Sequence, residues 1–220
     1  MEAITERSNL NLAYERVVAN GGALGIDGMT VDALKACCRT QGTTMTGRLL
    51  DGGYEPQSVR GKTIPKPGGG ERQLGIPTVV DRLVQQAIAQ VLTRLLDPTF
   101  SAHSYGFRPG RSAHQAVRAG ASYVAEGLTV VVEIDLEKFF ERVNHDILMA
   151  RLARHVADQR LLRIVRRFLE AGIMLEGVCV RREEGTPQGG PLSPLLANLL
   201  LDDLDKELEQ NPASDREEEQ

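Results

Sequence analysis

Apolar residues recur at helical spacing in residues 1–50. This spacing predicts a first helix within residues 1–20, ended by the sequence Asn20-Gly21-Gly22. A second helix, with Thr30 as its predicted N-cap, runs to about Leu50, where an Asp-Gly-Gly sequence breaks it. The chain is therefore expected to begin with a helical N-terminal part.

A change from helical to strand spacing follows. β-forming residues on both sides of Pro67-Gly68-Gly69-Gly70 predict a hairpin with a glycine tip. Thr78 or Asp81 opens a long helix that ends at Asp97-Pro98. After an irregular segment, another helix is expected from Ser112 to about Ala125.

The segment LTVVVEIDL, residues 128–136, is an apolar run that ends near an acid. A continuous run of this length, closed by an acid, predicts a strand buried on both faces. The remaining expected elements are two helices, a short hairpin and a last helix, over Asn144–Arg154, Asp158–Glu170, Ile173–Arg182 and Pro191 to about Glu209. Helices mixed with short strands indicate an α+β fold.

Composition excludes several classes of protein. A chain of 220 residues with 41% apolar residues is long enough to bury a core. The sequence has neither an apolar run of about 18 residues, which a transmembrane helix requires, nor a secretory signal. Its three unevenly spaced cysteines are typical of reduced thiols, so we expect a cytoplasmic protein without a membrane partner.

Charge is distributed unevenly. The net charge of the chain is −4, but residues 202–220 alone contain nine acids and two bases. The body of the chain is therefore mildly basic, which weakly favours a nucleic-acid partner. The acidic end, residues 210–220, has almost nothing to bury and is expected to be disordered.

Asp135 is the first candidate for chemistry, because an acid at the end of an apolar strand is unusual. Burying a carboxylate without a partner is costly, and a divalent cation would supply that partner. A capping aspartate at a strand-to-helix junction explains the same position. The residues alone leave both interpretations open.

The segment around Asp135, VVVEIDLEKFFERVNHDIL, resembles the palm motif of group II intron-type bacterial reverse transcriptases. The resemblance implies that Asp135 and the Leu136 carbonyl bind the two catalytic Mg²⁺ ions. It also implies that Phe140 lies under the sugar of the incoming dNTP. For Phe139, nucleotide contact and simple core packing are equally compatible with the sequence.

Two further segments resemble the same family. EEGTPQGGPLSPLLANLL matches its glycine turn at a helix N-terminus, which implies that Gln188 lies against the incoming nucleotide. KTIPKPGGGERQLGIP matches its fingers hairpin, which implies triphosphate contacts by Lys66 and Arg72. Arg60 and Lys62, nearby, are then expected to touch the template backbone.

Residues 24–34 and 100–117 complete the resemblance, and Arg108 and Arg111 in the second of them are expected to contact template or to order the loop. The family implies a fingers lobe with an N-terminal helical extension over residues 1–125 and a partial palm over residues 126–209. Asp202 and Asp203 lie in a helical pattern and are interpreted as solvated residues, not as the family's Tyr-x-Asp-Asp motif.

That motif does not occur in the 220 residues. The sequence therefore predicts an RNA-directed DNA polymerase by family, which needs RNA template, DNA primer and dNTPs but is expected to be inactive as this chain alone. The alternative is a non-catalytic maturase module that holds group II intron RNA. A homodimer through the exposed palm edge or the fingers is also expected. Six arginines are interpreted either as phosphate contacts or as a solvated helix face: Arg151, Arg154, Arg160, Arg163, Arg166 and Arg167.

Overall fold

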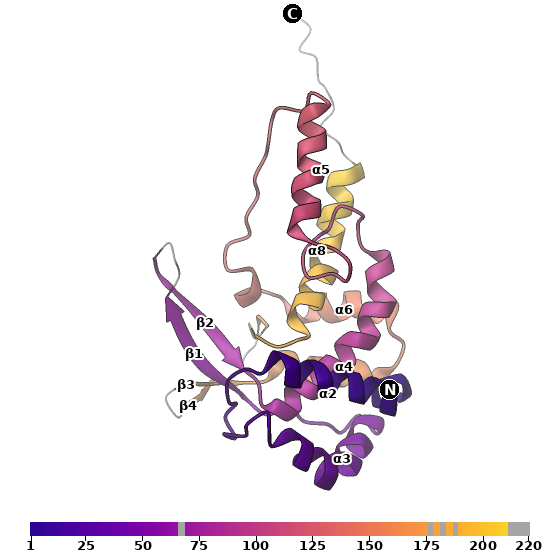
Figure 1. Cartoon of the computed structure of the whole chain (residues 1–220), viewed down its shortest axis with the longest axis vertical. Helices are drawn as coiled ribbons and strands as arrows, with labels where there is room; N and C mark the ends of the chain where they lie inside the picture. Colours follow the sequence, from indigo (N-terminus) through magenta and orange to yellow (C-terminus); the bar gives the residue numbers. More distant parts are fainter. Residues whose placement is uncertain (66–68, 176–177, 181–183, 187–188, 211–220) are drawn as a thin grey trace, which may run out of the picture.

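A computed structural model describes residues 1–65, 69–175, 178–180, 184–186 and 189–210 (Figure 1). The predicted nucleotide contacts Lys66 and Gln188 lie outside the described residues, as does the side chain of Arg72. The described part is mostly helical with one small sheet, so the predicted α+β class is confirmed. No helix in these ranges is long and apolar enough to span a membrane.

The N-terminal part contains three helices: α1 (Glu2–Thr5), α2 (Arg7–Asn20) and α3 (Leu34–Leu50). α2 ends as predicted, because Gly21 adopts the left-handed φ of 60° and its N–H donates to the Val18 carbonyl. α3 begins later than predicted. Thr30 caps only a turn, in which its Oγ1 accepts from the Ala33 N–H at 3.4 Å, and the helix starts at Leu34.

Helix α4 (Val79–Leu96) forms the centre of the core, and most of its residues are buried. The Thr78 side chain caps it as predicted, accepting from the Asp81 N–H. Two buried amides join α4 to α2. Gln90 donates to the Asn9 side-chain oxygen at 2.9 Å, and Asn9 donates to the Ala87 carbonyl at 3.1 Å. These hydrogen bonds give the buried amide groups partners, and without partners their burial would destabilise the fold.

The sheet has the strand order β2-β1-β3-β4 (Figure 1). β1 (Val59–Pro65) and β2 (Glu71–Ile76) form the first predicted hairpin, and β3 (Ile173–Leu175) and β4 (Val178–Val180) form the second. The sequence did not predict that the two hairpins join. β1 pairs with β3 in parallel, so residues far apart in the chain share one sheet.

The other predicted helices are confirmed to within about two residues of their bounds. Side-chain caps from Ser112, Asn144 and Asp158 start three of them. The elements are α5 (Ala113–Ala125), α6 (His145–His155), α7 (Gln159–Glu170) and α8 (Ser193–Gln210), with 3-10 turns η1 (Asp97–Thr99) and η2 (Phe139–Glu141). α6 packs against α7 and α8, and α8 also contacts α4, whereas α5 buries none of its residues.

The predicted buried strand over residues 128–136 is wrong. These residues are irregular and exposed, and Val130 and Val131 are 85% and 82% accessible. In Figure 1 the segment runs from α5 toward α6 as coil and does not join the sheet. A strand needs a neighbour for its backbone N–H and C=O groups, and no other described segment pairs with this one.

Candidate functional site

The segment around Phe140 and the glycine turn before α8 lie together. The Thr186 N–H donates to the Phe140 carbonyl at 2.7 Å, and the Gly185 N–H donates to the Val143 carbonyl at 2.8 Å. The buried His145 lies with Nε2 at 2.6 Å from the Gly185 carbonyl, and it must donate there because a carbonyl only accepts. Two predicted site segments, about 45 residues apart in the sequence, thus share one backbone network.

Close approach requires glycine at this turn. A Cβ at Gly185, which has a φ of 84°, would lie 2.8 Å from the Glu141 carbonyl oxygen. At Gly190 a Cβ would lie 2.3 Å from Oε1 of Gln85 on α4, and at Gly189 it would lie 3.1 Å from the Gly75 carbonyl of β2. The turn is therefore held against both the fingers hairpin and α4.

These elements enclose a cavity of about 610 Å³. Leu74 from β2, Phe140, and Gly189 and Gly190 line one part of it, and Arg16 from α2 lines another. The cavity is where the hairpin, η2 and the turn before α8 converge. It is the described region in which the predicted nucleotide-binding segments meet.

Arg82 contributes to the same cavity from α4, and it is only 6% exposed. Its guanidinium donates to the Gly21 carbonyl at 2.9 Å and to the Ala23 carbonyl at 3.0 Å. Burial lowers the pKa of this guanidinium, although arginine stays charged at neutral pH. Arg82 thus fixes the loop after α2, and the sequence analysis did not identify it.

The structure separates the two phenylalanines of the palm motif. Phe139 packs against the hydrophobic core, and Phe140 lines the cavity. Their rings meet edge to face with centroids 5.3 Å apart. Core packing is therefore the role that the structure gives to Phe139, and Phe140 is placed to contact a ligand.

Asp135 and Leu136 lie on the exposed coil before η2. Among the described residues, no three His, Cys, Asp or Glu side chains gather as a ligand set. Mg²⁺ prefers six oxygen ligands, and a carboxylate with one carbonyl supplies only part of that shell. The described residues by themselves do not fit a two-metal site, and no reaction step through a metal is derived from them.

Arg60 and Lys62 lie two residues apart on β1, so their side chains share one face of the hairpin. Arg60 is half-buried and pairs with Ile76, whereas Lys62 is exposed and pairs with Leu74. The backbone of Arg72 pairs with Ile64 on the same hairpin. The strand positions suit contacts along an extended ligand, and the template contact itself stays a prediction.

Arg108 and Arg111 differ in environment. The Arg108 side chain is 5% exposed and donates to the Asp97 carboxylate at 2.7 Å. It also donates to the carbonyls of Asp97, Ser101 and Ser104. Of the two predicted roles, the structure gives Arg108 the ordering of the loop. Arg111 is exposed and lies over the Tyr105 ring, with its guanidinium carbon 5.6 Å from the ring centroid.

Four of the six arginines on α6 and α7 make contacts within the chain. Arg167 donates to the Gly52 carbonyl at 3.0 Å and to the Tyr54 carbonyl at 2.8 Å, and Arg160 donates to the Leu50 carbonyl at 3.0 Å. Arg151 pairs with Asp203 at 2.8 Å, and Arg166 pairs with Asp146 and Glu170. These arginines join α7 to the end of α3 and α6 to α8, which neither predicted interpretation anticipated.

The interpretation of Asp202 as a solvated residue is wrong. Asp202 is 7% exposed and accepts from the Ser101 N–H at 3.0 Å and from Lys206. This residue of α8 faces the loop after α4, so its carboxylate bonds to the backbone of that loop and not to solvent. Asp203 is exposed as predicted, although it pairs with Arg151, and both acids lie within the predicted helix.

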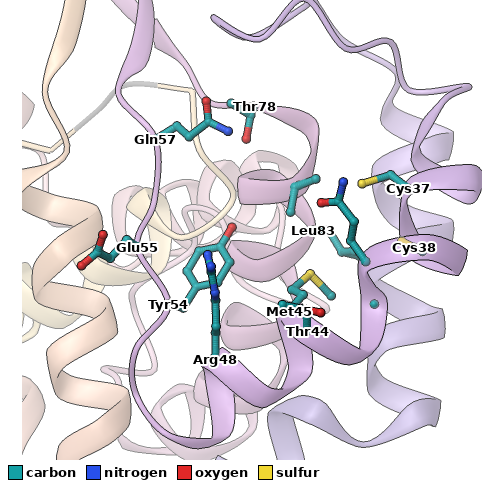
Figure 2. A pocket seen from close by; sticks show the side chains of 13 residues that line it. Cys37, Cys38, Thr44, Met45, Arg48, Tyr54, Glu55, Gln57, Thr78 and Leu83 are labelled. Carbon is teal, nitrogen blue, oxygen red and sulfur yellow. The ribbon is translucent and has the colours of Figure 1, made fainter.

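A second buried carboxylate anchors the start of β1. Asp81 accepts from the Tyr54 hydroxyl at 2.8 Å, the Thr78 hydroxyl at 2.7 Å and the Gln57 N–H at 3.2 Å. Burial raises the pKa of Asp81, and burial beside this carboxylate raises the pKa of Tyr54. Figure 2 shows Tyr54 between Arg48 of α3 and Thr78, in a cavity of about 290 Å³. A Thr followed three residues later by an acid is the sequence signal for such a cap, but the contacts of the acid with Tyr54 and Gln57 had no signal.

Comparison with known proteins gives a consistent result. The family described as Reverse transcriptase (RNA-dependent DNA polymerase) matches residues 64–217. Protein YkfC of Escherichia coli is 36% identical over 84% of this chain and 49% of its own length. Group II intron-encoded protein LtrA of Lactococcus lactis is 34% identical over 89% of this chain and 32% of its own. The chain thus spans about half or less of these relatives.

A solved structure has the same fold. A chain of a partial Cas6-RT-Cas1–Cas2 complex superposes with a TM-score of 0.61 at 28% identity, over 94% of this chain and 34% of that chain. The similarity covers nearly every described element. The resemblance inferred from the sequence is therefore confirmed by both the sequence and the structure comparisons.

Proposed function

Because this chain belongs to the reverse transcriptase (RNA-dependent DNA polymerase) family, we propose that it forms the fingers and part of the palm of a group II intron-type enzyme. Its reaction class is RNA-directed synthesis of DNA from dNTPs on an RNA template with a DNA primer. Its relatives are longer than this chain, so the activity of a complete protein is part of the proposal.

One observation carries the proposal. Three separately recognised segments, the hairpin β1–β2, the turn at Phe140 and the glycine turn before α8, converge on one cavity of about 610 Å³. A nucleotide needs a close backbone approach and a flat apolar surface for its sugar or base. Gly189, Gly190 and Phe140 supply these features at the cavity wall.

In this proposal Phe140 lies under the sugar of the incoming dNTP, where its ring excludes a 2′-hydroxyl. Lys66 and Arg72 of the hairpin contact the triphosphate, and Gln188 contacts the nucleotide from the glycine turn. A buried guanidinium or ammonium beside phosphate oxygens gives strong charge-assisted hydrogen bonds. Replacing Phe140 with alanine is expected to weaken discrimination against ribonucleotides, and Phe139→Ala is the matched control.

Metal chemistry belongs to the proposal as well. Asp135 and the Leu136 carbonyl are the proposed Mg²⁺ ligands of this chain, and a cation held there would supply positive charge beside the transferred phosphate. Asp135 lies a few residues before Phe140, so a metal held there is adjacent in sequence to the proposed sugar contact. Further ligands are required to complete the coordination shell.

A second candidate function is a maturase-type RNA-binding module. The observation that favours it is α3, which carries Lys35, Arg39 and Arg48 and no acidic residue. Such a helix attracts a phosphate backbone, and the similar LtrA is named a group II intron-encoded protein. In this alternative the N-terminal part holds intron RNA and the chain performs no chemistry.

Primer extension separates the two functions. The assay uses purified protein, Mg²⁺, dNTPs and a primed RNA template, with Asp135→Asn beside the parent chain. Extension that is lost in Asp135→Asn supports the polymerase. RNA binding that is retained in Asp135→Asn and weakens with salt, without extension, supports the RNA-binding module. Absence of RNA binding rejects the RNA-binding module, whereas absence of extension agrees with the expectation that this chain is inactive by itself.

Self-association is proposed through the exposed apolar segment 128–136, whose valine side chains are exposed to solvent. Only monomer in analytical ultracentrifugation at tens of micromolar would reject a homodimer.

A cytoplasmic bacterial location is proposed from the thiols and the family, and fractionation of an expressing bacterium tests it.

A further inference from the structure

Phe107 combines three features that are rare in one residue. Its ring is 81% exposed, its backbone has a φ of 54°, and it lines two cavities. A bulky residue at positive φ is strained and persists only where its surroundings hold it. A single exposed apolar side chain is ordinary, but an exposed ring on a strained backbone calls for an explanation.

Both neighbours of Phe107 are fixed. The Gly106 carbonyl accepts from the Asn198 side chain of α8 at 2.9 Å. Arg108 is anchored by its pair with Asp97 and by donation to three backbone carbonyls. The loop therefore cannot easily rotate to relieve the strain or to bury the ring. These anchors present the ring of Phe107 to solvent at a fixed place.

The surroundings of the ring are cationic. The two cavities, of about 610 Å³ and about 430 Å³, share Arg16, Gln86 and the Pro191 and Pro194 edge of α8 with Phe107. Arg94 lines the smaller one, and both Arg16 and Arg94 are exposed. None of the described residues that line either cavity is acidic. An anion is thus favoured on both sides of the ring.

A flat aromatic ring beside exposed guanidinium groups is the usual surface for an unpaired nucleotide strand, in which bases stack on the ring and phosphates lie on the cations. An apolar protein partner could also contact the ring, but it would not require cavities lined without acidic residues. Phe140, which also lines the larger cavity, adds a second aromatic surface. The charge pattern therefore favours nucleic acid over protein.

We propose that Phe107 is a stacking platform for a nucleobase of a bound single strand whose phosphates lie against Arg16 and Arg94. The inference deepens the proposed function and rests on it only for the identity of the strand. It assigns a base contact to a loop residue outside the hairpin and the palm motif. RNA and DNA strands share the chemistry, and the test distinguishes them.

The test measures binding of short RNA and DNA single strands, each carrying one fluorescent 2-aminopurine, by anisotropy and by quenching. Phe107→Ala is expected to weaken binding roughly 5- to 150-fold, the usual effect of losing one stacked base, and to abolish quenching. Phe107→Tyr retains both, and Phe107→Leu, which is apolar but cannot stack, loses quenching. Stronger binding of RNA than DNA identifies the strand as template.

Controls separate stacking from folding and from charge. Leu95→Ala removes an exposed apolar side chain that lines neither cavity, and it should change neither signal. Because the Phe107 ring is exposed, Phe107→Ala should also leave the unfolding temperature unchanged. Arg16→Gln and Arg94→Gln should lower the salt dependence of binding, whereas Phe107→Ala should not.

The proposal is overturned if neither strand binds the parent chain, or if Phe107→Ala or Phe107→Leu binds and quenches like the parent. Unchanged binding together with reduced self-association in Phe107→Ala would make the ring a protein contact instead. Primer extension is scored separately: Phe107-dependent quenching without extension leaves the stacking platform standing, and extension without such quenching leaves the polymerase standing. The two proposals therefore fail in distinguishable ways.

Discussion

Arg108 gives the sharpest test of how the loop between α4 and α5 is held. Replacing it with alanine removes a guanidinium that is 5% exposed and that donates to the Asp97 carboxylate and to three backbone carbonyls. The carbonyls of Ser101 and Ser104 would lose these donors. If Arg108 orders the loop, Arg108→Ala should lose much of its stability. If Arg108 contacts the template, Arg108→Ala should lose RNA binding alone.

The magnitude follows from the contacts. Removing one partner of a buried ion pair costs about 3–5 kcal/mol. Asp97 is 27% exposed and can be partly rehydrated, so we expect the lower end, about 3 kcal/mol. For a chain of this size each kcal/mol shifts the unfolding temperature by roughly 2–4 °C, which gives a decrease of about 6–12 °C. Arg108→Lys keeps the positive charge but loses the forked set of N–H donors. Its unfolding temperature should therefore fall between those of the parent chain and Arg108→Ala.

The assay is urea and thermal unfolding followed by circular dichroism, with RNA binding measured on the same samples. Arg111→Ala is the matched control, because the Arg111 side chain is exposed and lies over the Tyr105 ring. It should cost less than about 1 kcal/mol. An Arg108→Ala protein as stable as Arg111→Ala, but without RNA binding, would refute the structural role.

Three more predictions follow from single sites. The raised pKa of Asp81 means that its contribution to stability is fully present below its ordinary value of 3.8 and is lost as the pH rises through the folded value. The free energy of unfolding of the parent relative to Asp81→Asn should therefore fall with rising pH in urea titrations, and a constant difference would contradict this. Gly185→Ala should destabilise by about 1–3 kcal/mol through its positive φ and its contact with the Glu141 carbonyl, whereas Gly120→Ala, in open space on α5, should stabilise by about 0.5–1 kcal/mol; equal thermal shifts would contradict both. Val131→Ala should change the stability of the monomer by less than about 0.5 kcal/mol because its side chain is exposed, and a much larger loss would place it inside an assembly.

Local sequence determined most elements. The caps at Thr78, Ser112, Asn144 and Asp158 start helices as predicted, because a side-chain oxygen satisfies backbone N–H groups within the same turn. The glycine tip and the β-forming residues around it gave the first hairpin. Motif order identified the family, which the comparisons confirmed. These features depend on residues close together in the chain.

The local sequence pattern predicted the wrong structure where a residue or segment depends on a partner from elsewhere in the chain. Residues 128–136 have the composition of a buried strand, but a strand exists only where another segment supplies hydrogen bonds, and no described segment does so. Asp202 is a charged residue within a helix and would be expected at the surface, yet it is buried and accepts a hydrogen bond from the Ser101 N–H. Neither outcome is visible in the residues themselves.

The sequence by itself determined which segments are helical, where most of them begin, and which family they belong to. Only the tertiary structure decided that Arg108 orders a loop, that Phe139 packs inward while Phe140 faces a cavity, and that the two hairpins share one sheet. The reason is physical. A helix cap is satisfied within a few residues, whereas burial, ion pairs and strand pairing depend on groups that folding brings together from distant parts of the chain.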